Sequence, residues 1–149
     1  MIYWLTGQPG AGKTTIARQL KDVLETNKPC YHIDGDDIRE LFDNKDYSEQ
    51  GRRKNIELAQ QISQYLNSKQ VDSVVSLVSP YKDQRDMFKS KMDNQLIEIF
   101  VHTSEIRGRE KYFVSNYEQP TIDFIDVDTT NKPEFETVQE LKLKLKSYE

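Results

Sequence analysis

The residues best suited to chemistry form a run near the N-terminus that matches the phosphate-binding pattern G-x-x-x-x-G-K-[ST] in full. Glycines let backbone N–H groups turn toward an anion and let the chain approach it closely. The lysine supplies a positive charge for the β and γ phosphates, and the next hydroxyl suits Mg²⁺. The expected phosphate-binding residues are Gly7, Gln8, Pro9, Gly10, Ala11, Gly12, Lys13, Thr14 and Thr15.

The flanking sequence supplies the elements that such a loop requires. Residues 2–5 are apolar and favour a buried strand. After the loop, apolar residues recur at helical spacing, and Asn27-Lys28-Pro29 is expected to end that helix. The order strand, glycine-rich loop, helix is the context that supports the motif.

A second group of polar residues follows the next predicted strand, residues 30–33. Asp34 and Asp36 come at its carboxyl end, where ligands bind in open α/β sheets. Asp34 is favoured as a functional residue over a solvated loop acid. Asp36 or Asp37 could equally cap the short helix predicted from Ile38.

Basic residues open the next predicted helix at Arg52. Positive charge in a first helical turn opposes the helix dipole unless an anion lies nearby. Arg52 and Asn55 are three residues apart and share a face, so we expect them to meet an anionic ligand. Arg53 and Lys54 are interpreted as a solvated basic face.

Further strands are predicted at residues 71–78, 96–101 and 121–127, and a final helix buries Val138, Leu141 and Leu145. Strands and helices alternate throughout. This pattern predicts one α/β domain over residues 1–149, with a parallel sheet of about five strands and helices on both faces. Such an arrangement is a three-layer fold of the P-loop NTPase and nucleotide-kinase type.

Composition narrows the classes of partner. The formal net charge of −4 argues against a protein that mainly grips nucleic acid. The single cysteine, Cys30, excludes an internal disulfide and reads as a small buried hydrophobe. No apolar run reaches the length of a membrane span, so a cytoplasmic protein is expected. His32 and His102 are interpreted as structural.

Several motifs, taken in order along nearly the whole chain, resemble those of adenylyl-sulfate kinases. The specific ones are D-G-D-x-x-R and S-P-Y. The matching pieces are the phosphate loop, Asp34-Gly35-Asp36-Asp37-Ile38-Arg39, Tyr47-Ser48 with Arg52 and Asn55-Ile56, Val78-Ser79-Pro80-Tyr81-Lys82 with Arg85, and Tyr117-Glu118-Gln119-Pro120.

The resemblance implies an enzyme that transfers the γ-phosphate of ATP, with Mg²⁺, to the ribose 3′-hydroxyl of adenylyl sulfate. It implies catalytic roles for Lys13, Asp34, Asp36 and Ser79, metal contacts from Thr14 and Asp36, and a nucleotide contact from Arg107. The resemblance leaves two assignments open, in which either Asp34 or Asp36 takes the hydroxyl proton and the other helps to hold the metal. The implied substrate-binding residues are Arg39, Tyr47, Arg52, Asn55, Ser79, Pro80 and Tyr81. The resemblance also implies a homodimer, because members of the family often pair.

The chain departs from the family pattern in three places. Gly51 replaces an acid that usually precedes the arginine. The lid motif R-D-x-K-G-L-Y begins at Arg107 but lacks the Asp and has its lysine out of register. Only Val114-Ser115-Asn116 remains of a longer stretch, so the lid, at about residues 104–118, is shortened.

Because of these departures, the phosphoryl acceptor could instead be another small molecule with a hydroxyl group, such as a cytidine-diphosphate derivative or a sugar nucleotide. A non-catalytic nucleotide-binding switch is the alternative from another class. The acceptor-side set of Asp34, Arg39, Arg52 and Asn55 argues against it, because a switch needs no second anion pocket.

Overall fold

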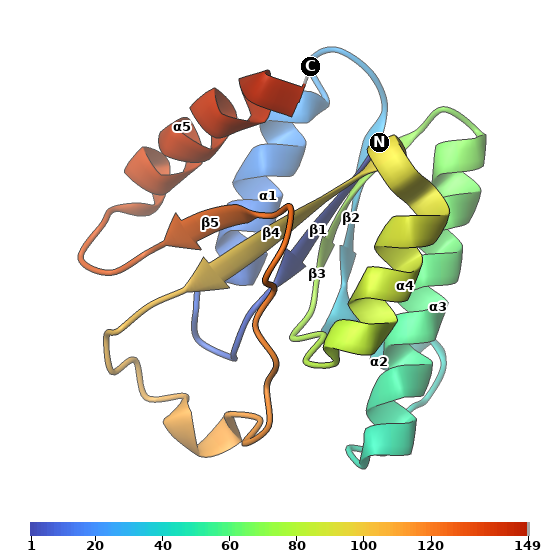
Figure 1. Cartoon of the computed structure of the whole chain (residues 1–149), viewed down its shortest axis with the longest axis vertical. Coiled ribbons are helices and arrows are strands. Elements are labelled where there is room, and N and C mark those ends of the chain that lie inside the picture. The colour runs from blue at the N-terminus through green and yellow to red at the C-terminus, as the bar shows by residue number, and fades with distance from the viewer. Residues whose placement is uncertain (149) are drawn as a thin grey trace.

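A computed structural model describes residues 1–148, and it contains a five-stranded parallel sheet (Figure 1). The strands are β1 (Ile2–Thr6), β2 (Cys30–Asp34), β3 (Asp72–Ser76), β4 (Leu96–His102) and β5 (Ile125–Asp128). Their order across the sheet is β2-β3-β1-β4-β5, and all pairings are parallel. The prediction of a parallel α/β sheet with helices on both faces is confirmed.

Helices cover the sheet on both sides and connect its strands. They are α1 (Lys13–Leu24), α2 (Gly35–Leu41), α3 (Glu49–Ser68), α4 (Lys82–Met92) and α5 (Glu134–Leu145). Short 3₁₀ turns occur at η1 (Asp93–Gln95), η2 (Glu110–Tyr112) and η3 (Lys146–Tyr148). Helices α1 and α5 lie on one face, and α3 and α4 lie on the other (Figure 1).

The core has one hydrophobic cluster on each face of the sheet, because central strands of a parallel sheet are buried on both sides. The predicted stripe of α5 is confirmed, since Val138, Leu141 and Leu145 are all buried. Cys30 is also buried, and burial raises the pKa of its thiol to about 11. This environment suits a packing residue and not a nucleophile.

Several element boundaries differ from the predictions; strand β3, for example, ends at Ser76 and not at residue 78. Helix α2 begins at Gly35, so Asp34 occupies the cap position and Asp36 lies in the first turn. Helix α3 begins at Glu49, because the Ser48 side chain accepts a hydrogen bond from the Gly51 N–H. Strand β5 begins at Ile125 and not at residue 121.

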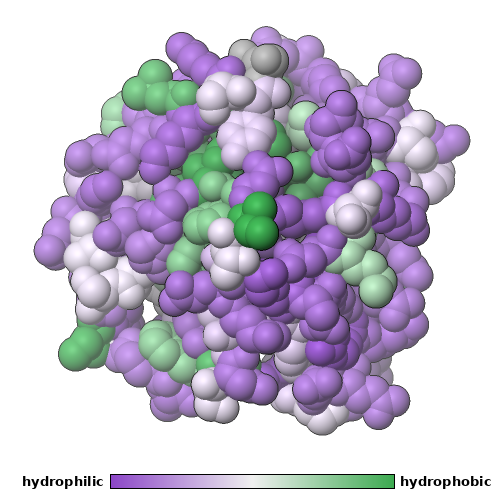
Figure 2. Space-filling view, in the orientation of Figure 1, coloured by the Kyte–Doolittle hydropathy of each residue, from purple (hydrophilic) through white to green (hydrophobic). Residues whose placement is uncertain are grey.

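The viewed face of the molecule is mostly hydrophilic, with hydrophobic residues visible between α5 and α4 (Figure 2). None of the helices in the described part of the chain combines the length and apolar character needed to cross a lipid bilayer.

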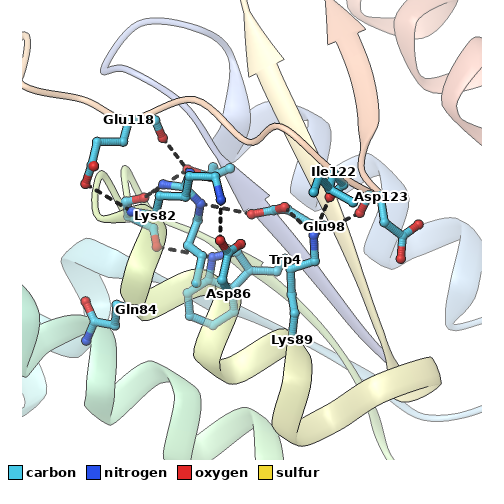
Figure 3. A network of polar contacts seen from close by, with 12 residues as sticks. Trp4, Lys82, Gln84, Asp86, Lys89, Glu98, Glu118, Ile122 and Asp123 are labelled. Atoms are coloured by element: carbon cyan, nitrogen blue, oxygen red, sulfur yellow. Dashed lines mark hydrogen bonds and ion pairs between the residues drawn. The ribbon is translucent and has the colours of Figure 1, made fainter.

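A buried ionic network joins α4 to β4 and to the segment that precedes β5 (Figure 3). Glu98 lies in β4 and is almost fully buried; its carboxylate accepts hydrogen bonds from Arg85 Nε at 2.9 Å and Lys89 Nζ at 2.8 Å. Lys89 also donates to the carbonyls of Ile122 and Asp123. Arg85 donates to the carbonyls of Ser79 and Glu118, so the network fixes a strand-end loop relative to the chain that returns to the sheet.

We predict that Glu98→Ala lowers the free energy of unfolding by about 3–5 kcal/mol, because it leaves a buried Arg85 without its counter-charge. Urea unfolding of the full chain measures this. The control is Asp83→Ala, which removes an exposed pair with Arg53 and should cost no more than about 1 kcal/mol. Equal losses in the two variants would contradict a structural role for the buried network.

Candidate active site

The carboxyl ends of the strands border a cavity of about 910 Å³. The phosphate loop forms one wall, the starts of α2 and α3 form another, and residues 76–80 form a third. Segment 109–114 contributes to the remaining side. Most of the predicted site residues line this cavity: Pro9, Gly10, Gly12, Lys13, Thr14, Thr15, Asp34, Asp36, Arg39, Tyr47, Arg52, Asn55, Ser79 and Pro80.

A smaller cavity of about 450 Å³ lies beside the first, and Gln8, Ala11 and Arg107 line it. Pro9 and Gly10 border both cavities, so the phosphate loop separates them. Gly7 lines neither cavity. A Cβ there would overlap the Val101 carbonyl oxygen, so Gly7 lets the loop pass against β4.

Two glycines give the phosphate loop its curvature. Gly10 has φ 85° and Gly12 has φ 102°, both in the left-handed region that other residues rarely adopt. Gly12 caps α1 without any side chain, so the first-turn N–H groups of the helix are left facing the loop. A helix N-terminus with free N–H groups attracts anions, which suits a phosphate site.

Lys13 is buried beneath this loop. Its side chain donates a hydrogen bond to the Gln8 carbonyl at 3.0 Å. Burial lowers the pKa of Lys13 to about 8; the charge of Asp34 opposes this shift, and Arg109 adds to it. A bound polyphosphate would supply the negative charge that favours the protonated form.

Thr14 and Asp34 meet at the cavity wall. The Thr14 hydroxyl donates to Asp34 Oδ1 at 3.2 Å, and the Ser76 hydroxyl donates to the same oxygen at 2.8 Å. His32 contacts Ser76 Oγ at 2.6 Å, and burial lowers the pKa of that imidazole. The structural role predicted for His32 agrees with this position behind Asp34.

Asp36 also lines the cavity, one helical position beyond Gly35. Its carboxylate has no hydrogen bond or ion pair with any residue between 1 and 148. The two acids therefore differ in setting. Asp34 is held by two hydroxyls, whereas Asp36 is available to a ligand.

Arg52 and Asn55 project from α3 into the same cavity, as their spacing predicts. The Arg52 guanidinium forms no ion pair or hydrogen bond within the described chain. Asn55 is buried; its Nδ2 donates to the Gly35 carbonyl, and its Oδ1 has no partner among residues 1–148. A polar, anionic ligand could pair with the Arg52 guanidinium and with the buried Asn55 Oδ1, because neither has a partner within the described residues. Because α3 begins three residues earlier than predicted, Arg52 lies beyond its first turn.

Arg39 and Tyr47 form an adjacent part of the wall. The Arg39 guanidinium lies 4.0 Å from the Tyr47 ring centre and donates to the carbonyls of Asn44 and Asp46. The same loop explains the glycine at position 51. A Cβ at Gly51 would overlap the Asp46 carbonyl, so a larger residue there would displace the loop that carries Tyr47.

Ser79 and Tyr81 differ in their access to the cavity. Ser79 has φ 47° and lines the cavity, and its hydroxyl accepts a hydrogen bond from Trp4 Nε1 at 3.3 Å. Tyr81 does not line either cavity. Its ring is buried in the hydrophobic core and covered by Arg53, so the substrate contact expected of Tyr81 is wrong.

The lid segment contains two arginines with different surroundings. Arg107, expected to bind the nucleotide, donates to the carbonyls of Gly10, Ala11 and Thr129. Arg109 and Lys111 line the larger cavity, and the sequence interpretation did not select them. Both lie in the charged run that follows β4, where the sequence gives no reason to prefer one basic residue over the next.

Known proteins match both the sequence and the fold. The profile of the adenylylsulphate kinase family matches residues 1–121. The adenylyl-sulfate kinase of Oceanobacillus iheyensis is 29% identical, over 93% of this chain and 80% of that protein. The bifunctional enzyme NodQ of Rhizobium meliloti is 35% identical over 68% of this chain, which spans 16% of the NodQ length.

A solved structure supports the same fold. The adenylyl-sulfate kinase of Mycobacterium tuberculosis, in complex with AMPPNP and adenylyl sulfate, superimposes with a TM-score of 0.82. It is 20% identical, and the match covers 97% of this chain and 96% of that one. Because the family profile covers most of the residues and the fold agrees, this chain belongs to the adenylylsulphate kinase family of phosphotransferases.

Proposed function

We propose that the protein is an ATP-dependent kinase that phosphorylates the 3′-hydroxyl of adenylyl sulfate. One observation carries this proposal: a single cavity contains the phosphate loop on one side and an unpaired Arg52 with an unpaired Asn55 Oδ1 on another. A phosphoryl donor and an anionic acceptor therefore have separate recognition groups within one space. Family membership supports the same acceptor.

The donor side rests on Lys13 and the loop amides. The Lys13 ammonium would neutralise charge on the β and γ phosphates. Thr14 and Asp34 offer two oxygen donors 3.2 Å apart, which fits a Mg²⁺ ion held by few protein ligands and by phosphates. Magnesium, when bound, would neutralise charge that develops on the phosphates. The geometry thus favours Asp34 over Asp36 beside the metal.

On the acceptor side, Asp36 is the proposed general base that accepts the hydroxyl proton. In the proposed step the acceptor hydroxyl oxygen bonds to the γ-phosphorus, the bond to the β–γ bridging oxygen breaks, and ADP leaves. The hydroxyl proton passes to the Asp36 carboxylate, which has no competing partner within the described residues. Ser79 stays unmodified in this scheme and helps to shape the wall through its contact with Trp4.

Recognition of the acceptor rests on three residues of the second wall. Arg52 would pair with the phosphosulfate group, and Asn55 Oδ1 would accept a hydrogen bond from the acceptor. Tyr47, held against Arg39, offers an aromatic face to the adenine. The homodimer implied by the resemblance remains a prediction.

A second candidate is a kinase of the same kind that acts on another nucleotide hydroxyl. The shortened lid, at about residues 104–118, favours it, because a lid completes the site around both ligands and a shorter one leaves more of the acceptor free. The acceptor specificity is therefore the part of the proposal that experiment must decide.

We expect ADP to form from ATP and Mg²⁺ only when adenylyl sulfate is present, with one 3′-phosphorylated product per ADP. A coupled assay of ADP release, with chromatography of the nucleotides, measures this. AMP replaces adenylyl sulfate as a control that lacks the sulfate. ATP binding without turnover on adenylyl sulfate would reject this acceptor and leave the second candidate, which a panel of nucleotide hydroxyls would then test.

Affinity for ATP should fall as the pH rises from about 7 to about 9.5, because Lys13 loses its charge above its lowered pKa of about 8. Calorimetric titration of the full chain with ATP and Mg²⁺ measures the dissociation constant at each pH. Lys13→Met removes the titrating group and should bind ATP weakly with little pH dependence in this range. A flat profile in the unsubstituted protein would show that the Lys13 ammonium does not contribute to binding.

Arg52→Gln should raise the KM for adenylyl sulfate about 10- to 100-fold and change the KM for ATP less than about twofold, because only the acceptor loses a charged contact. Steady-state kinetics with each substrate varied in turn provides both values. Arg53→Gln is the matched control, since Arg53 is paired with Glu49 and Asp83 and lines neither cavity. Equal increases in both KM values would contradict a specific contact between Arg52 and the acceptor and would indicate a structural role.

A further inference from the structure

Segment 107–114 lies against the phosphate loop, although the two are about a hundred residues apart in sequence. Its first arginine, Arg107, has its guanidinium fully engaged: it donates to Gly10 O and Ala11 O at 3.2 Å each and to Thr129 O at 3.0 Å. It also pairs with Glu105 at 2.9 Å. Arg107 therefore fixes the backbone of the loop and has little capacity left for a ligand.

Arg109 has the opposite character. It lines the larger cavity, and its guanidinium forms no hydrogen bond or ion pair with residues 1–148; the guanidinium lies 5.2 Å from the centre of the Tyr112 ring. Its Cβ lies directly over Gly10, since a Cβ on that glycine would come within 3.0 Å of it. The Arg109 side chain thus begins next to the phosphate loop, and its guanidinium is unpaired within the described residues.

The positive charge of Arg109 affects Lys13, the buried lysine of the phosphate loop. Burial is the main cause of the lowered pKa of Lys13, and the charge of Asp34 opposes it. The positive charge of Arg109 is the next cause, and it lowers this pKa further. Two cations that influence each other in this way lie where a polyphosphate would be attracted by both. Lys111 also lines the cavity but is not among the groups that affect Lys13.

The turn that carries Arg109 is held by a carboxylate. Glu110 accepts hydrogen bonds from the backbone N–H groups of Arg107 at 3.1 Å, Gly108 at 3.2 Å and Arg109 at 3.1 Å. Gly108 has φ 82° and nothing lies near its missing Cβ, so the glycine serves the turn and not a close contact. The backbone on the N-terminal side of Arg109 is therefore ordered by its own neighbour.

A second contact holds the segment from its C-terminal side. The Gln8 side chain pairs with both backbone groups of Val114: Nε2 donates to the Val114 carbonyl at 2.8 Å, and the Val114 N–H donates to Oε1 at 2.9 Å. Gln8 also accepts the Lys13 hydrogen bond through its own carbonyl. One residue of the phosphate loop thus touches both the buried lysine and the end of the lid segment.

We propose that Arg109 is a catalytic residue that binds the phosphates of the donor nucleotide and stabilises negative charge on the transferred phosphoryl group, and that Gln8 is the residue that positions it. The guanidinium fork matches phosphate oxygens, and phosphoryl transfer depends mainly on positioning and charge neutralisation. This inference rests on the proposed kinase function but names a different residue from those of the family motif. The shortened lid would then still contribute to catalysis, through the Arg109 guanidinium.

The first test substitutes Arg109 and measures binding to inorganic tripolyphosphate and to AMP. Arg109→Gln should weaken tripolyphosphate about 10-fold and leave AMP within about twofold, because only the former engages the lost charge. Turnover with ATP and the acceptor should fall about 100-fold in kcat, with partial recovery in Arg109→Lys. Arg18→Gln, the same charge change at an exposed position of α1, and Lys111→Gln should have smaller effects.

The second test addresses Gln8. Gln8→Met keeps the length of the side chain and removes both hydrogen bonds to Val114, so trypsin should cut after Arg109 and Lys111 faster while the melting temperature of the chain changes little. The losses in kcat from Gln8→Met and Arg109→Gln should be less than multiplicative in the double variant, because the first acts through the second.

Two results would overturn the inference: unchanged tripolyphosphate affinity in Arg109→Gln, or fully multiplicative effects in the double variant. The tripolyphosphate measurement needs no acceptor, whereas the comparison of kcat values needs an acceptor that the protein phosphorylates. If adenylyl sulfate is not phosphorylated but Arg109→Gln still weakens tripolyphosphate, the proposed acceptor fails and the role of Arg109 in phosphate binding stands.

Discussion

A phosphate loop that turns its N–H groups toward an anion must turn its carbonyls the other way, and those carbonyls need donors. Here Lys13 donates to the Gln8 carbonyl, Arg107 to those of Gly10 and Ala11, and the Thr129 hydroxyl to that of Ala11 at 2.9 Å. The donors come from α1, the lid segment and the connection between β5 and α5. The shape of the donor site therefore depends on three segments that are far apart in the sequence and meet in the folded domain.

Much of the fold follows from local pattern and chemistry. The glycine-lysine motif, the β-branched runs and the stripe of α5 indicate the parallel sheet and the phosphate loop, because each reflects a requirement that is read within one element. Arg52 and Asn55 could be paired for the same reason, since helical spacing alone puts them on one face. Burial of Cys30 follows from its place at the start of a core strand.

The remaining features depend on contacts between distant segments. Tyr81 follows a strand end and was assigned to the site, but packing against α3 turns its ring into the core. Arg107 and Arg109 cannot be ranked from sequence, because the carbonyls that engage one of them belong to the phosphate loop and to the β5–α5 connection. The start of α3 is a local feature that the prediction missed: Ser48 caps the helix from within a polar loop, and Gly51 in the first turn is a poor helix former.

The buried Arg85 joins the loop after β3 to the chain that returns toward β5, and Tyr117 hydrogen-bonds Thr6 of β1 at 2.7 Å. The wall formed by residues 76–80 and the returning chain are thus joined by buried hydrogen bonds. The stretch between His102 and Val114 is attached differently, because its hydrogen bonds run to the phosphate loop and to the connection between β5 and α5. Movement of that stretch would break those hydrogen bonds and leave the bonds of Arg85 intact, so exchange of ADP for ATP would not require any rearrangement of the acceptor pocket.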